Sequence, residues 1–232
     1  MSKKKNANDE NKLNKNEIKL IYFTTNNQFY SSQHILTSYY SSALCSEIKN
    51  NNPTHIVYTR KIKDTSIRIN FISIDLEDIS TNEVYFIKST KGGDNILIFV
   101  DQEKGVESIK LFKNILNFIS NTCNVTNKKI RIVGVCTEEE KISDECGENQ
   151  LTALTEKYGL EHTYTELQIN KKGILVKLID ESTLEGVENH HNALNSSDED
   201  IRSNAIVSPY DYYSEKMEID NDDNSLSKCI IL

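Results

Sequence analysis

HIVYTRKIKDTSIRINFISID, residues 55–75, contains two strand-like runs with no helix between them. The first run covers residues 55–62, the second covers residues 66–75, and only the tripeptide KDT joins them. A parallel pair of strands needs a crossover of about a dozen residues or more, so a three-residue link allows only an antiparallel pair. The sequence therefore predicts a hairpin at this point.

On both sides of the hairpin, short apolar runs alternate with longer segments of helical period. Strands are predicted at 18–23, 95–101 and 129–136, helices at 31–48, 106–119 and 150–159, and the runs HTYTEL (162–167) and GILVKLI (173–179) complete the series. Such alternation is typical of the α/β class. We predict a doubly wound, mostly parallel six-stranded sheet with one antiparallel strand.

The composition predicts one domain with a tail at each end. Residues 1–17 are rich in Lys and Asn without periodicity, and residues 188–232 carry ten acidic against three basic side chains. Both segments are predicted to be disordered, and the domain is placed at residues 18–187. His190 and His191 fall in the C-terminal tail and are predicted to be solvated.

The charge and the cysteines restrict the partners and the compartment. A formal net charge of −8 without a basic stripe argues against nucleic acid as a partner. The five cysteines lack CxxC spacing, so we expect a reducing compartment and no zinc site. No signal peptide is expected, because residues 1–17 lack an apolar core, and no stretch approaches the roughly 20 apolar residues of a membrane span.

The last four residues printed, Cys229 to Leu232, read CIIL and form a CaaX box. A final leucine favours geranylgeranylation of Cys229. The preceding segment is acidic, with only Lys216 and Lys228 as nearby bases, and one prenyl chain alone binds membranes reversibly. We expect a lipid-anchored protein on the cytoplasmic side of the cell membrane or an endomembrane, partly cytosolic.

An α/β core with one early hairpin, followed by a polar tail and a CaaX box, resembles the Ras-like small GTPases. NILIFVDQEKGVESIKLF looks like the family's fourth strand and following helix, and IRIVGVCTEE like its fifth strand and base-reading loop. LTALTEKYGLEHTYTELQINKKGI looks like its last helix, strand and helix. The resemblance covers residues 18 to about 187 and implies a small-GTPase, P-loop NTPase-like fold.

The family's phosphate loop, GxxxxGK[ST], corresponds to TTNNQFYS at residues 24–31. Its glycines let backbone N–H groups surround the phosphates, its lysine reaches them, and its hydroxyl residue binds Mg²⁺. Here Thr24 and Phe29 stand at the glycine positions, Tyr30 stands at the lysine position, and Ser31 is retained. The loop has therefore lost its cation and its flexible residues.

The other nucleotide motifs are also altered. The family's DxxG corresponds to Asp75-Leu-Glu-Asp78, and Ile79 stands where Ras-type members place the water-orienting glutamine. The base-reading NKxD corresponds to residues 135–138, where Glu138 keeps only the carboxylate, and the supporting SAK corresponds to residues 167–169. No catalytic residue is assigned.

Three positions keep the family's residue types. Ser31, Thr54 and Asp75 match the two Mg²⁺-ligating hydroxyls and the nearby acid, so the resemblance implies nucleotide binding by Ser31, Thr54, Asp75 and Glu138, with Ser31 and Thr54 on the metal. Chance retention is the simpler explanation, because the segment around Ser31 is rich in serine. The effector-facing segment corresponds to Asn51–Thr59, whose family charges are replaced, so we expect effectors other than the usual Ras partners.

The resemblance implies a prenylated, membrane-associated signalling protein of the small-GTPase family, degenerate in GTP binding and hydrolysis. The alternative is a divergent but working GTPase that binds GTP or GDP and Mg²⁺ through Ser31, Thr54 and Asp75. In a third hypothesis the tail is the functional part and the domain carries it.

Overall fold

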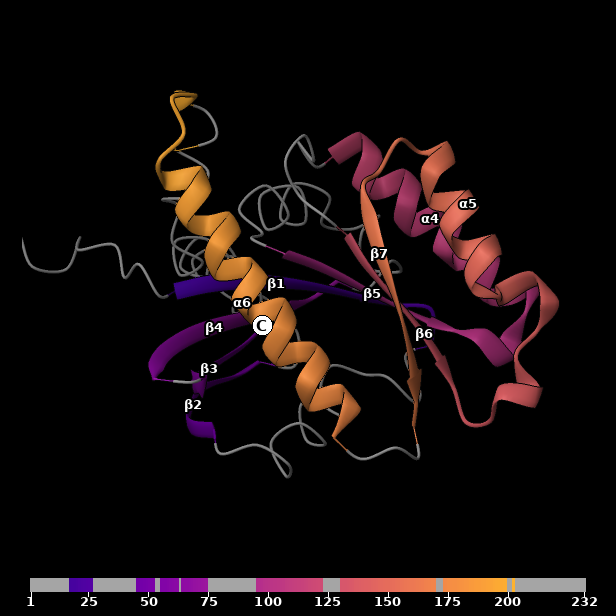
Figure 1. Ribbon diagram of the computed structural model, residues 1–232, viewed down its shortest axis with the longest axis horizontal. Helices are drawn as coiled ribbons and strands as arrows, with labels where there is room; N and C mark the ends of the chain where they lie inside the picture. Colours follow the sequence, from indigo (N-terminus) through magenta and orange to yellow (C-terminus); the bar gives the residue numbers. More distant parts are fainter. Residues whose placement is uncertain are drawn as a thin grey trace, which may run out of the picture.

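The computed structural model describes residues 17–26, 45–52, 55–62, 64–74, 95–122, 130–169, 173–199 and 202, and these form an α/β fold (Figure 1). The strands are β1 (Glu17–Thr24), β2 (Cys45–Asn52), β3 (His55–Ile62), β4 (Thr65–Ser73), β5 (Asn95–Asp101), β6 (Ile130–Cys136) and β7 (His162–Gln168). The α-helices are α4 (Val106–Thr122), α5 (Glu148–Lys157) and α6 (Ile174–Leu194). Three short 3₁₀ helices are η1 (Gln102–Lys104), η2 (Glu139–Lys141) and η3 (Asp144–Cys146).

The described strands form one sheet in the order β2-β3-β4-β1-β5-β6-β7. β1 is parallel to β4 and β5, and β6 is parallel to β5 and β7. β3 is antiparallel to both of its neighbours, so it is the one described strand that runs against the others. The predicted hairpin is confirmed, with His55 opposite Ile72 and Ile62 opposite Thr65.

The α/β class and the mostly parallel sheet with one antiparallel strand are thus as predicted, but β2 adds a strand to the six expected. The sequence pattern predicted a helix over residues 31–48. The structure shows instead that Cys45–Asn52 is extended and pairs with β3, so the last four residues of the predicted helix belong to a strand. Pairing satisfies backbone groups along the edge of β3 that would otherwise be exposed, and this tertiary gain overrides the local helical pattern.

One face of the sheet is covered by α6. Leu20, Tyr22 and Phe99 on the sheet are buried together with Leu178 and Ile179 of the helix. The ring of Tyr22 contacts the ring of Phe99 edge-on, with centroids 5.1 Å apart.

The opposite face is covered by α4 and α5. Ile21, Phe23 and Ile98 pack with Phe112 of α4 and Leu151 of α5. Every residue of the neighbouring strands β5 and β6 is buried, as expected for strands that have helices on both sides.

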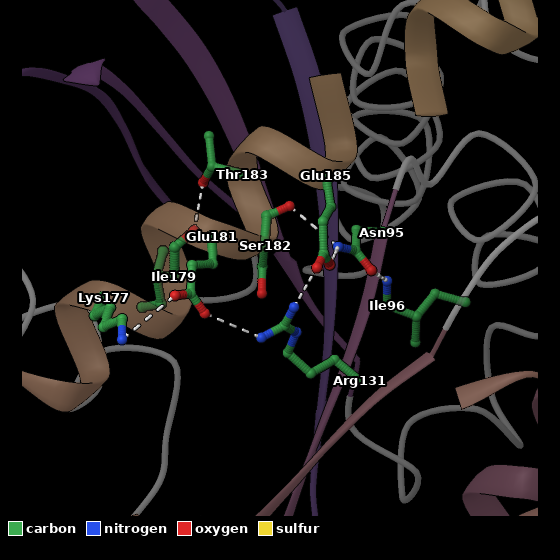
Figure 2. A network of polar contacts seen from close by, with 9 residues as sticks. All are labelled: Asn95, Ile96, Arg131, Lys177, Ile179, Glu181, Ser182, Thr183 and Glu185. Carbon is green, nitrogen blue, oxygen red and sulfur yellow. Dashed lines mark hydrogen bonds and ion pairs between the residues drawn. The ribbon is translucent and has the colours of Figure 1, made fainter. Parts of the chain in front are cut away.

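Charged and polar groups also hold α6 to the sheet (Figure 2). The guanidinium of Arg131 on β6 pairs with Glu181, at 3.4 Å, and with Glu185. The Asn95 side-chain amide donates to the Ser182 carbonyl at 3.1 Å. On the other side of the helix, Arg60 and Asp180 form a two-bond ion pair.

The last helix extends beyond the predicted end of the domain. α6 runs to Leu194, so the boundary placed after residue 187 lies inside the helix. His190 is buried, contrary to the expectation of a solvated side chain. Residues 1–16 and 203–232, which contain most of the predicted tails, lie outside the described part of the chain.

Candidate functional site

The candidate site lies where β1 and β5 end side by side. After β1 the chain continues to β2, β3 and β4 on one side, and β5, β6 and β7 follow on the other. The chain therefore changes direction between β1 and β5, and in open α/β sheets ligands bind outside the carboxyl ends of the strands at such a switch point. The described residues at this place are Thr24, Thr25, Asn26 and Asp101.

Thr25 ties the segment after β1 to β5 and α4. Its N–H donates to the carbonyl of Phe99 at 3.0 Å. Its Oγ1 accepts from the N–H of Asp101 at 2.9 Å and donates to Oγ of Ser108 at 3.1 Å. All of these groups are buried, so the second residue of the predicted phosphate loop is held by the protein itself.

Asn26 and Asp101 form a side-chain hydrogen bond between the ends of β1 and β5. Nδ2 of Asn26 donates to Oδ2 of Asp101 at 2.6 Å, and the Asn26 N–H donates to Oγ1 of Thr24 at 3.1 Å. The other carboxylate oxygen of Asp101 accepts from the N–H of Glu103 at 3.0 Å and so caps η1. Within the described residues, no lysine or arginine pairs with Asp101.

This arrangement is unfavourable for an anion. The N–H groups of Thr25 and Asn26 both have internal acceptors, so neither is available to a phosphate oxygen. Asp101 is 7% exposed and places an acidic side chain at the switch point. Phosphate sites need free N–H donors or cations, and an acid at short distance opposes them.

The loop after β6 is held by Glu103. The carboxylate of Glu103 accepts from both the N–H and the hydroxyl of Thr137. Partial burial acts to raise the pKa of Glu103, but the two Thr137 hydrogen bonds, the charge of Lys141 and the Glu138 N–H outweigh it and lower that pKa. The side chain is therefore a fixed anionic acceptor for this loop.

A buried polar cluster supports the same end of the sheet. Nε2 of Gln102 donates to the Cys146 carbonyl at 2.8 Å and to the Tyr164 hydroxyl at 3.1 Å. Burial raises the pKa of the Cys146 thiol to about 11, with the charges of Glu145 and Asp101 adding to it. Burial also raises the pKa of Tyr164 to about 12. Neither group is ionised at neutral pH, so the cluster is structural rather than nucleophilic.

Exposed acids surround the outer part of these loops. Residues 138–148 carry six acidic side chains and one lysine, Lys141. Lys141 pairs with Glu138, with the two charged atoms 3.4 Å apart. The exposed acids here are Glu103, Glu138, Glu139, Glu140, Asp144, Glu145 and Glu148. This concentration of negative charge also disfavours a polyphosphate.

The structure describes one of the predicted site residues, Glu138. Ser31, Thr54, Asp75 and Cys229 lie outside the described residues. Glu138 is described and its side chain is 57% exposed. The two segments matched to the base-reading motifs do meet, because the N–H of Ile169 donates to the carbonyl of Cys136 at 3.0 Å.

The sequence patterns missed the contact between Asn26 and Asp101. The signal in the sequence was an acid, Asp101, at the end of the predicted strand 95–101, and the sheet places this strand next to β1. In the described part of the chain, no three His, Cys, Asp or Glu side chains are grouped as metal ligands. None of the helices described there is long and apolar enough to cross a membrane.

Comparison of the chain with family models gives no match, and comparison with curated proteins gives none either.

Proposed function

We propose that the chain is a membrane-associated signalling protein with a Ras-like small-GTPase fold, prenylated at Cys229. In this proposal it no longer binds nucleotide and is therefore a pseudo-GTPase. Its output comes from fixed protein-binding surfaces, because a switch that depends on γ-phosphate and Mg²⁺ cannot operate when neither is held.

The sheet supports the fold part of this proposal. Six strands, β1 and β3 to β7, with β3 antiparallel, correspond to the six-stranded sheet that the family resemblance implies. Helices cover both faces, as in a doubly wound sheet. β2 is additional, and it occupies the outer edge of β3, where part of the effector-facing segment lies. A partner of this protein therefore cannot add a strand to β3 in the way an open edge would allow.

The observation that carries the loss of nucleotide binding is the contact between Asn26 and Asp101. It joins the start of the phosphate loop to a buried acid, and the first two loop N–H donors after Thr24 are already bonded. These residues do not fit a bound polyphosphate, so no hydrolysis step is assigned to the protein.

The missing groups indicate the size of the effect. Tyr30 at the lysine position, Phe29 at a glycine position and the altered base-reading motif remove several charge-assisted bonds. Each such bond contributes about 1.5–3 kcal/mol, so a total loss of about 6 kcal/mol is expected. At about 1.4 kcal/mol per decade, affinity falls roughly ten-thousandfold relative to an intact site.

The lipid anchor rests on the CaaX box. One geranylgeranyl chain on Cys229 gives reversible attachment, and the acidic residues before it weaken binding to an anionic leaflet. Intact-mass measurement of the protein from eukaryotic cells tests this directly: the prenyl mass is expected on the wild type and absent from Cys229→Ser. An unmodified wild type would contradict it.

Native mass spectrometry of the gently purified full chain tests the nucleotide claim. The proposal predicts protein without guanine nucleotide, with or without added Mg²⁺. About one GTP or GDP per chain would support a working GTPase with Mg²⁺ on Ser31 and Thr54 near Asp75 instead.

Deleting residues 196–225 while keeping LSKCIIL tests the tail hypothesis, since partner binding that survives the deletion excludes the tail as the functional part.

A further inference from the structure

β7 is an open edge of the sheet that the described strands form. Among those strands it pairs with β6 alone, over seven consecutive residue pairs without irregularity. β5 and β6 are buried throughout, whereas six of the seven residues of β7 are partly or fully exposed. Figure 1 shows β7 beside β6. β2, at the other edge, has register shifts on both sides of Ile48. Such irregularities protect an edge from pairing, and β7 lacks them.

The hydrogen bonds that flank β7 show which backbone groups face outward. The carbonyl of Glu161 accepts from Ile130, and the N–H of Ile169 donates to Cys136. Odd-numbered residues of β7 therefore face β6, and the even-numbered residues His162, Tyr164, Glu166 and Gln168 direct N–H and C=O away from it. No backbone bond from another described element reaches these outward groups.

We propose that β7 pairs antiparallel with β7 of a second copy of the chain, around a two-fold axis at Tyr164. Tyr164 then lies opposite Tyr164 of the second copy, and His162 lies opposite Glu166. Three of the four outward-facing residues, His162, Tyr164 and Glu166, form hydrogen-bonded pairs within β7, which antiparallel geometry requires of residues whose backbone groups face each other. A two-fold axis makes the same patch serve both subunits.

The side chains of β7 complement themselves in this register. Histidine faces a carboxylate at both ends, and Thr163 faces Thr165 of the second copy at the intervening pairs. Cross-strand pairs of opposite charge, aromatic pairs and threonine pairs all stabilise a sheet. This match of a histidine ring with a carboxylate acceptor at both ends favours a second copy over a foreign strand.

The neighbouring registers are less favourable. Centring the pair on Glu166 places two carboxylates directly opposite each other, which is destabilising. Centring it on Thr165 moves His162 away from Glu166 and sets the two Glu166 side chains on a diagonal. The register centred on Tyr164 is the one of these three that pairs the charges.

Sedimentation equilibrium of the full chain, in wild type and variants, tests the proposal. The wild type is expected to show a reversible monomer–dimer equilibrium. Glu166→Pro removes two outward N–H donors per dimer and leaves β6 pairing intact, since proline is tolerated on an edge whose N–H faces solvent. Dimer affinity is expected to fall about tenfold or more.

Two further variants serve as controls. Glu166→Gln keeps the N–H and should weaken the dimer less than Glu166→Pro does. Thr163→Pro removes an N–H that faces β6 and should lower the melting temperature in circular dichroism, whereas Glu166→Pro should leave it nearly unchanged. A wild type that stays monomeric at all concentrations, or a dimer whose affinity Glu166→Pro leaves unchanged, would overturn the proposal. Nucleotide content does not enter these readouts, so the result is independent of the pseudo-GTPase assignment.

Discussion

Replacing Gly134 by alanine tests the buried cluster that supports the carboxyl end of the sheet. A Cβ built on Gly134 would lie 2.7 Å from Cδ and Oε1 of Gln102 and would collide with the hydroxyl of Tyr164. Real side chains do not tolerate such contacts, so Gln102 must move and lose its bonds to Tyr164 and to the Cys146 carbonyl. Overpacking costs about 1–3 kcal/mol and each lost hydrogen bond about 1 kcal/mol, giving a destabilisation of about 3 kcal/mol.

A double-mutant cycle identifies the cause. Tyr164→Phe alone should cost about 1 kcal/mol, since it removes one hydrogen-bond partner of Gln102. Combined with Gly134→Ala it should relieve the collision with the hydroxyl, so the double variant should be more stable than the sum of the single effects by about 1 kcal/mol or more. Gly147→Ala is the matched control, because a Cβ there meets nothing within 4 Å.

The unfolding free energy of all four variants is measured by urea unfolding followed by circular dichroism. One protein concentration is used throughout, because dimerisation is linked to stability. Strict additivity of Gly134→Ala and Tyr164→Phe, or a Gly134→Ala variant no less stable than Gly147→Ala, would refute the reasoning.

The ion pairs that attach α6 predict unequal losses of stability in urea unfolding. Arg131→Met should cost about 1–2 kcal/mol, because the two acids that lose their partner are nearly half exposed. The double variant Glu181→Ala with Glu185→Ala should cost about 3 kcal/mol or more, because it leaves the buried charge of Arg131 without a partner. The reverse order would contradict the burial argument. The raised pKa of Cys146 predicts that stability is fully present below the usual thiol pKa of 9.0 and is lost as the pH rises through about 11. Unfolding measured across this range should show a smaller loss for Cys146→Ala than for wild type, and equal losses would count against the assignment. Thr25→Val should lower the unfolding free energy by about 1–3 kcal/mol, because valine keeps the side-chain shape but cannot form the hydrogen bonds to Asp101 and Ser108. A change within the error of the urea measurement would contradict this prediction.

The hairpin between β3 and β4 could be predicted from the sequence because the short link between the two runs leaves only one pairing geometry. β2 could not, because residues 31–48 have a helical pattern and the gain from pairing with β3 is not visible locally. Strand pairing is a long-range interaction, whereas periodicity reports only neighbours along the chain.

The end of α6 was missed for a related reason. Composition becomes polar after residue 187, but Thr183, Gly186 and His190 continue the buried face that begins at Ile179, with helical spacing. Polar side chains can be buried when the fold supplies partners, so composition alone misplaces such a boundary.

At the candidate site, the departures of residues 24–31 from the phosphate-loop pattern were evident from residue types, because the roles of glycine and lysine are chemical and local. The contact between Asn26 and Asp101 depends on β1 and β5 being adjacent, which only the assembled sheet establishes. Motif reasoning therefore could not identify the contact between these two residues.

Isothermal titration of the nucleotide-free full chain with GTP and GDP in the presence of Mg²⁺ tests the central claim most directly. The account predicts no detectable heat of binding up to millimolar nucleotide, because the N–H groups of Thr25 and Asn26 have internal acceptors and the Asp101 carboxylate lies beside them. Submicromolar binding of either nucleotide would contradict it.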